Sequence, residues 1–87
     1  MTSLEIQKLL DEKNGRIDEL QINLKRKDYI GVKIAMGRAT KTEYRAEIDQ
    51  CTAWAEEINT LNTEVESLKI QLEQAKAEED ATNENVQ

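Results

Sequence analysis

Apolar side chains recur at alternating intervals of three and four residues from Tyr44 to Ala75, which is the spacing of a heptad-patterned helix. From Ile58 onward the first heptad position is mostly β-branched and the fourth is mostly leucine, a pattern that favours parallel dimers. Such a helix is built to pack against other helices. The predicted oligomer or partner seam consists of Cys51, Trp54, Ile58, Leu61, Val65, Leu68 and Leu72. Across a parallel seam, Glu64 of one chain would form an ion pair with Lys69 of another.

The composition agrees with a long helical protein. The 87 residues include no proline, three glycines and no phenylalanine, and 34% of them are charged. A chain without proline and with few glycines can remain helical over long distances. The sequence therefore predicts an all-α, oligomeric protein, built as a long helix, a short connecting helix and a longer heptad-patterned helix in a helical hairpin or coiled coil.

Two capping boxes and one glycine place the element boundaries. Thr2-x-x-Glu5 and Thr40-x-x-Glu43 each match the pattern that begins a helix, and Gly37 sits where a helix commonly ends. The predicted elements are a helix over about 3–27, a short helix over about 29–36 and a helix over about 41–77, which together form one module over residues 1–77. Acidic residues crowd the end of the last helix, so we expect an acidic, frayed tail over residues 78–87.

The short helix contributes apolar residues near the predicted turn. We expect the corner to be packed by Tyr29, Val32, Ile34, Met36 and Tyr44. A first helix of about 24 residues spans roughly 36 Å and a second helix of about 38 residues roughly 57 Å. The first helix would then cover the second only to about Glu64. Because an uncovered apolar stripe from Val65 to Ala75 would be unstable, we expect another copy of the chain or another protein to cover it.

The residue types present give little support for catalysis. The chain has no histidine and one cysteine, so a Cys–His zinc site is excluded, and neighbouring acids such as Glu56 and Glu57 point in different directions on a helix. No glycine-rich phosphate loop is present. We expect no enzyme activity, cofactor or metal, and we expect Cys51 to act as a small buried side chain. The apolar runs are too short to span a membrane, and the first residues lack a signal-peptide pattern.

Charge is distributed unevenly along the sequence. Residues 25–45 contain seven bases and two acids, for +5, whereas residues 46–87 contain eleven acids and two lysines, for −9. These two regions could attract each other between copies. A basic patch of Lys25, Arg26, Lys27, Lys33 and Arg38 leaves open an alternative, a small regulatory protein that binds nucleic acid through residues 25–45. The net charge of −6 disfavours that alternative, as does the position of the first three bases at a helix end, where cations complement the helix dipole.

Residues 24–60 contain three short motifs, Asp28-Tyr29-x-x-x-Lys33-x-x-x-Gly37, Glu43-Tyr44 and Trp54-x-x-Glu57-Ile58-Asn59. Together these motifs resemble a group of bacteriophage and prophage proteins that are often encoded among tail genes. The chain departs from the pattern at Met36, where an acid is common, and at Ala55, where arginine is common. The resemblance implies a tail, fibre or baseplate component that oligomerises or docks another phage structural protein, or else a soluble assembly chaperone. It also implies a location in the host cytoplasm during assembly, or in the virion, and it supplies no catalytic residues.

Overall fold

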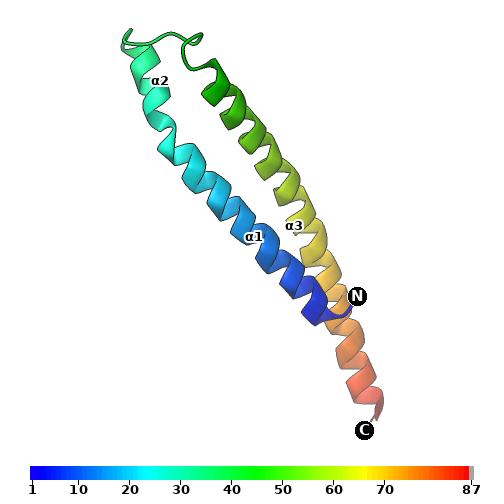
Figure 1. The fold of residues 1–87 in the computed structure, drawn as a ribbon. Coiled ribbons are helices and arrows are strands. Elements are labelled where there is room, and N and C mark those ends of the chain that lie inside the picture. The colour runs from blue at the N-terminus through cyan, green and yellow to red at the C-terminus, as the bar shows by residue number, and fades with distance from the viewer. Residues whose placement is uncertain (87) are drawn as a thin grey trace.

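The chain folds into a helical hairpin. A computed structural model describes the backbone of residues 1–86 and the side chains of residues 1–81. It contains α1 (Ser3–Arg26), α2 (Asp28–Ala35) and α3 (Arg45–Val86), with no strand among the described residues. Figure 1 shows α1 and α2 as one arm that runs antiparallel to α3, and the molecule measures 71 × 15 × 15 Å. The predicted all-α hairpin is therefore confirmed.

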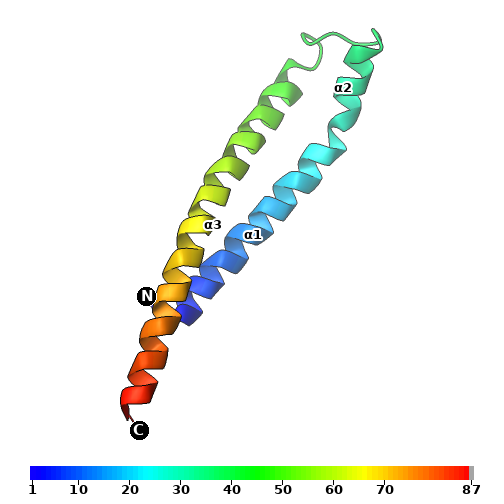
Figure 2. The same ribbon diagram turned by 180° about the vertical axis from the view of Figure 1, so that it is seen from behind.

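The first arm begins at a capping box and bends once. The Thr2 hydroxyl accepts a hydrogen bond from the Glu5 amide at 3.2 Å, which satisfies a free amide at the start of α1. At the other end, the Lys27 amide donates to the Leu24 carbonyl, and the Lys27 carbonyl accepts from the Ile30 amide. Because Lys27 takes part in hydrogen bonds on both sides, α2 continues α1 with only a small change of direction (Figure 2).

Gly37 ends α2 and reverses the chain. Its φ of 72° lies in the left-handed region that favours glycine. The Gly37 amide donates to the Ile34 carbonyl and the Arg38 amide to the Lys33 carbonyl, the two bonds of a Schellman motif. The Thr40 hydroxyl then accepts from the Glu43 amide at 3.3 Å, but residues 41–44 form a turn and helix α3 begins at Arg45. The predicted start at residue 41 is therefore four residues too early.

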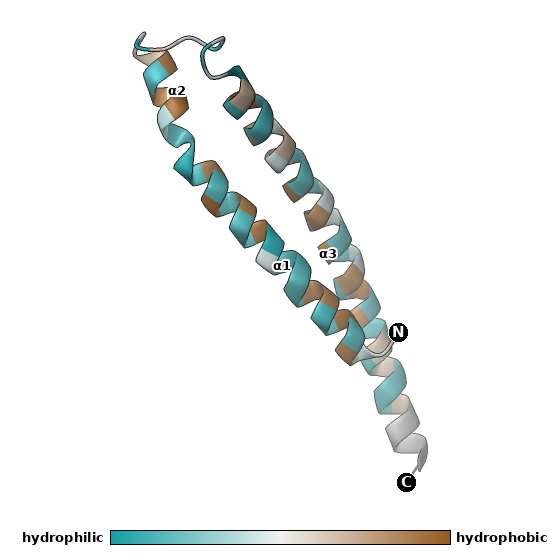
Figure 3. Cartoon of the chain, in the orientation of Figure 1, coloured by the Kyte–Doolittle hydropathy of each residue, from teal (hydrophilic) through white to brown (hydrophobic). Residues whose placement is uncertain are grey.

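The core lies along the side where the two arms face each other. Figure 3, in which the ribbon is coloured by residue hydropathy, shows apolar residues in brown recurring along both helices. Leu20 is fully buried, and a cluster of buried residues lies nearer the end of the hairpin away from the loop, where the N-terminus meets the last third of α3. This cluster consists of Ile6, Leu10, Ile17, Val65 and Leu68, with Leu9, Ile58, Leu61, Leu72 and Ala75 packed against it.

The predicted bare stretch from Val65 to Ala75 is wrong. Val65 is 5% exposed and Leu68 is 8% exposed, because α1 covers both. The prediction took the first arm to be one helix of about 24 residues. In the structure the eight residues of α2 continue that arm, so the turn lies farther from α1 than predicted. With the turn displaced in this way, α1 reaches the last third of α3, where the Ser3 amide donates to Glu79 Oε1 at 3.0 Å and the Ser3 hydroxyl to Oε2 at 2.6 Å.

Helix α3 also extends beyond its predicted end near residue 77, as far as Val86. Glu79 is one of the acids that were expected to fray this end. It instead binds the N-terminus of α1, where free amides and the helix dipole favour an anion. This contact lowers the pKa of Glu79, mainly through its hydrogen bond with the Ser3 hydroxyl. The remainder of the predicted frayed tail, Gln87 and the side chains of residues 82–86, lies outside the described residues.

Candidate functional site: a groove at the loop end

Two ion pairs fix the middle of the hairpin. Arg16 Nε lies 2.7 Å from Glu57 Oε2 and its Nη2 lies 3.3 Å from Glu57 Oε1, while Lys13 binds the carboxylate of Glu64. The two-bond contact with Arg16 lowers the pKa of Glu57, and the same hydrogen bonds raise the pKa of Arg16. Residue numbers rise along one helix and fall along the other in these pairs, so they fix the antiparallel register.

The predicted inter-chain pair of Glu64 and Lys69 has partners within this chain instead. Glu64 binds Lys13, and the Lys69 ammonium lies 3.6 Å from a carboxylate oxygen of Glu66, one turn earlier on the same helix. Glu64 and Lys69 therefore each form an ion pair within the chain, without a second copy.

The predicted partner seam divides into two parts in the structure. The part nearer the C-terminus packs within the hairpin, because Val65 and Leu68 are buried and Ile58, Leu61 and Leu72 pack against them. The other part, Cys51 and Trp54, lies toward the loop end, formed by α2, the turn over residues 36–44 and the beginning of α3. Both of these side chains are only half-buried. Ile58, Leu61 and Leu72 are half-buried as well, but they pack against the core cluster, whereas Cys51 and Trp54 do not belong to it.

A cavity of about 640 Å³ opens between the two arms at this end. No Cα atom of α2 lies within 8 Å of a Cα atom of α3, so these two helices are not closely packed. Both views show the arms separating toward the loop (Figure 1 and Figure 2). We call this cavity the loop-end groove. The lining of the groove comes from both arms and is mostly apolar. The first arm contributes Leu24, Ile30, Gly31 and Ile34, and α3 contributes Ile48, Cys51, Thr52 and Ala55. Lys27, Asp28 and Lys41 add charged groups to this lining.

An aromatic pair closes the loop end beyond the groove. The rings of Tyr29 and Tyr44 meet edge to face with centroids 6.2 Å apart. The Lys33 ammonium lies 5.3 Å and 5.8 Å from the two ring centres and donates a hydrogen bond to the Tyr44 hydroxyl at 3.2 Å. These contacts join α2 to the residue before α3 and hold the ends of the two arms at a fixed separation.

The structure brings together only some of the predicted corner residues. Tyr29 and Tyr44 are in contact and Ile34 lines the groove, whereas Val32 and Met36 are more than half exposed. Ile30, which is not one of the predicted corner residues, is the buried residue of α2, with 4% exposure. Because α2 continues α1, counting on from Leu24 through Lys27 in steps of three places Ile30 on the stripe of the first arm.

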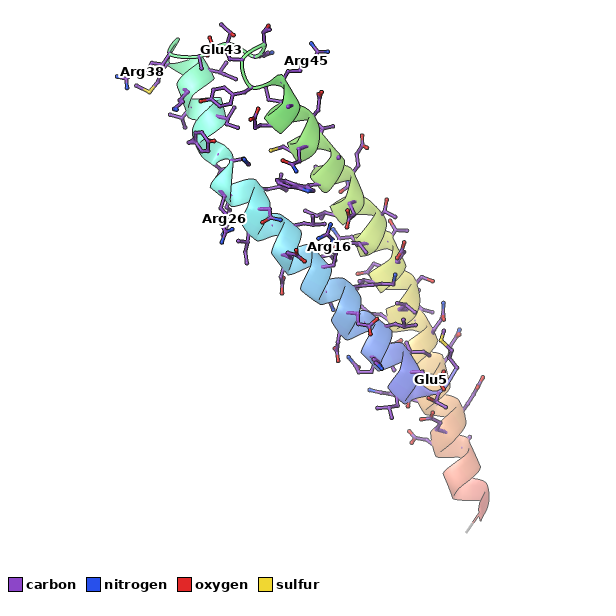
Figure 4. The ribbon with its side chains drawn as sticks, in the orientation of Figure 1. Glu5, Arg16, Arg26, Arg38, Glu43 and Arg45 are labelled. Carbon is purple, nitrogen blue, oxygen red and sulfur yellow. The ribbon has the colours of Figure 1, made fainter. Side chains whose placement is uncertain are left out.

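The predicted basic patch also lies at the loop end. Lys25, Arg26 and Arg38 are exposed, and Figure 4 shows Arg38 and Arg45 near the turn and Arg26 directed away from α3. The other two members have neighbours: Lys33 contacts the tyrosine rings and Lys27 lines the groove. Of the five residues of the patch, Lys27 therefore lies at the groove, whereas Arg26 points away from α3 and Arg38 lies in the turn.

Comparison with protein-family models, curated proteins and solved structures finds no match for this chain. Among the described residues, no helix is both long and apolar enough to cross a membrane. No group of three or more histidine, cysteine, aspartate or glutamate side chains in that part of the chain is arranged to hold a metal ion. The loop-end groove is the candidate binding site that its lining from both arms defines.

Proposed function

We propose that this chain is a non-enzymatic assembly module that binds a helix in the loop-end groove. The observation that carries the proposal is the groove itself, in which both arms present apolar side chains without packing closely against each other. Elsewhere along the hairpin the same two arms bury their apolar side chains in a shared core. A cavity of about 420 Å³ also lies between α1 and α3 beside Leu9 and Leu68, and the loop-end groove is the larger of these two.

A helix suits this groove better than a small molecule does. The lining of the groove repeats on α3 at Ile48, Cys51, Thr52 and Ala55, the intervals of one helix face. An amphipathic helix laid into a groove of this kind buries apolar side chains spaced by one turn. Helices that pack directly have axes about 8–10 Å apart. The backbones of α2 and α3 stay farther from each other than such packing requires, which leaves room for a third helix to lie against both. Completing the burial of one half-buried isoleucine contributes roughly half of the 1.5–3 kcal/mol that burying a fully exposed one would contribute.

The biological setting that we propose is the assembly of a bacteriophage tail, fibre or baseplate. The support is the resemblance of residues 24–60 to phage-encoded proteins, and three of the residues that carry it, Tyr29, Lys33 and Tyr44, form the contact that closes the loop end. A virion component stays in the mature particle, whereas a soluble assembly chaperone leaves before the particle is complete. Mass spectrometry of purified particles should detect the chain if it is a virion component, whereas its absence from the particles would favour the chaperone.

The groove can be tested with two matched substitutions. Ala55→Glu places a charged side chain in the groove, and Ala53→Glu places the same side chain at an exposed position two residues away that does not line it. The wild type and the Ala53→Glu variant, purified under native conditions, should have a solution mass well above the 10.0 kDa of one chain, and Ala55→Glu should lose that excess. A wild type that purifies as a monomer, or equal masses for all three proteins, would contradict the proposal. Unchanged helical circular dichroism confirms that each variant is folded.

A further inference from the structure

We infer that the occupant of the loop-end groove is an acidic amphipathic helix of another protein, which places a carboxylate beside Lys27. This inference rests on the proposed function and adds the chemistry of the partner. It follows from the ion pairs of the half-buried cations on the first arm, and from the apolar side chains that the helices of this chain expose.

The first arm has three half-buried cations, Lys13, Arg16 and Lys27. Lys13 is paired with Glu64 and Arg16 with Glu57, so α3 supplies a carboxylate to each of these two. Lys27 lines the loop-end groove and, among the described residues, belongs to no ion pair. Lys27 is thus the half-buried cation of the first arm to which α3 supplies no carboxylate.

Two acids of the chain lie near Lys27 without forming an ion pair with it. Asp28 also lines the groove, but it is exposed and lies in the first turn of α2, where the helix dipole favours an anion. By the register of the Arg16–Glu57 pair, Lys27 is level with position 46 of α3, and Glu47 beside that level does not line the groove. The ammonium group of Lys27 can therefore accept a carboxylate from outside the chain.

A helix that covers the groove removes water from the charges that line it. Burying the Lys27 ammonium further is strongly unfavourable unless a carboxylate lies beside it. Lys41 lines the same groove from the turn, and residues 25–45 together carry +5. A partner helix with acids beside its apolar stripe supplies the missing carboxylate and is attracted to this end of the hairpin, whereas a helix with lysines in those positions is repelled.

The chain itself does not offer such a helix. Among the described residues, the large apolar side chains that its three helices expose are Leu4 and Ile22 on α1, Tyr29 and Val32 on α2, and Ile70 on α3. Those of α1 are about five turns apart, and those of α2 lie among the bases of residues 25–38. Helix α3 carries most of the acids but exposes one such side chain. The occupant is therefore a helix of another protein.

Two synthetic amphipathic helices serve as probes of the full-length chain. Each peptide is three heptads long with leucine at the first and fourth positions, and its fifth and seventh positions carry glutamate in one peptide and lysine in the other. Fluorescence anisotropy measures the binding of each labelled peptide. The wild type should bind the glutamate peptide at least about tenfold more tightly than the lysine peptide. Added salt should reduce this preference.

Matched charge changes test whether the preference arises in the groove. Lys27→Glu should reverse the preference, because like charges then meet in the groove, and Lys27→Gln, which adds no new charge, should reduce it. Lys25→Glu changes the charge equally at an exposed position that does not line the groove, so it should keep the preference. Ala55→Glu should lose the glutamate peptide, whereas Ala53→Glu should bind it as the wild type does. Circular dichroism confirms that each variant is folded.

Several outcomes would overturn the inference and leave the proposed helix-binding function intact. One is equal affinity of the wild type for the two peptides, or a preference for the lysine peptide. Another is an equal effect of Lys27→Glu and Lys25→Glu, which would mean that Lys27 does not select the partner. A third is a pure chain that forms dimers and loses them in Ala55→Glu, because the occupant would then be a second copy.

Failure of both peptides to bind has two readings that the native mass separates. If the natively purified chain keeps a mass above that of one chain, and Ala55→Glu loses it, the acidic partner is wrong and the proposed function stands. If the natively purified chain is a monomer, both the inference and the proposed function are wrong.

Discussion

The guanidinium of Arg16 and the carboxylate of Glu57 join α1 and α3 through two hydrogen bonds, of 2.7 Å and 3.3 Å. One turn farther toward the loop, this register places Leu20 level with Trp54. Another two turns along, α1 ends at Arg26 and the beginning of α3 faces α2 instead. The pair thus stands close to the boundary between the closed part of the hairpin, with its shared core, and the open part that contains the loop-end groove.

The closed part should depend strongly on Leu20, whose side chain is fully buried. Leu20→Ala should lower the free energy of unfolding by about 2–5 kcal/mol, because it removes buried methyl groups and leaves a cavity. Leu4→Ala is the matched control, since Leu4 lies on the same helix but is exposed, and it should change that free energy by less than about 0.5 kcal/mol. Urea denaturation followed by circular dichroism measures both values. Similar losses for the two variants would mean that α1 does not pack through Leu20.

Val65 and Leu68 provide a test of where the hairpin ends and the assembly surface begins. If these two residues formed only the predicted partner seam, Val65→Asp combined with Leu68→Asp would dissociate an oligomer and leave the hairpin helical. Because both side chains are buried against α1, we expect the double variant to lose its helical circular dichroism at room temperature. A double variant that remains helical but becomes monomeric would show instead that Val65 and Leu68 belong to the assembly surface.

Stability should fall in acid because of Glu57 and Glu79. The pKa of each carboxyl group is lower in the folded chain than its ordinary value of 4.5, so the unfolded chain takes up protons first as the pH falls. The stabilisation from these groups is fully present above about pH 4.5 and is lost as the pH falls through the lower folded pKa values. Glu57→Gln should flatten this loss in urea titrations from neutral pH into acid. Glu56→Gln, at the exposed neighbouring position, should leave the slope as in the wild type.

Two glycines should respond in opposite directions to the same substitution. Gly37 has a φ of 72°, so Gly37→Ala forces an unfavourable backbone conformation and should destabilise the chain by about 1 kcal/mol. Gly15 lies within α1, and a Cβ atom added there meets no atom within 4 Å. Gly15→Ala should therefore stabilise the chain by about 0.5–1 kcal/mol. Thermal unfolding of the two variants beside the wild type measures the sign of each change, and two changes of the same sign would contradict the assigned turn.

The sequence was informative wherever the signal was local. Thr2 with Glu5, and Gly37, marked a helix start and a helix end correctly, because capping depends on residues only a few positions apart. The apolar stripe of α3 was also found. Its partner was assigned incorrectly, because the length of the first arm depends on whether the chain turns at Lys27 or continues through it. Periodicity does not decide that question. Ile30 was missed for the same reason. The loop-end groove could not be predicted either, because it depends on the angle between the two arms, which local patterns do not determine.

Hydrogen–deuterium exchange of assembled and dissociated protein tests the central claim most directly, because it locates the surface that assembly covers. The Ala55→Glu variant supplies the dissociated state and the Ala53→Glu variant the assembled control. We predict that assembly slows exchange most strongly in α2 and over residues 45–55, which line the loop-end groove. Slowed exchange confined to residues 61–75, or none at all, would contradict the assignment of the groove as the assembly surface.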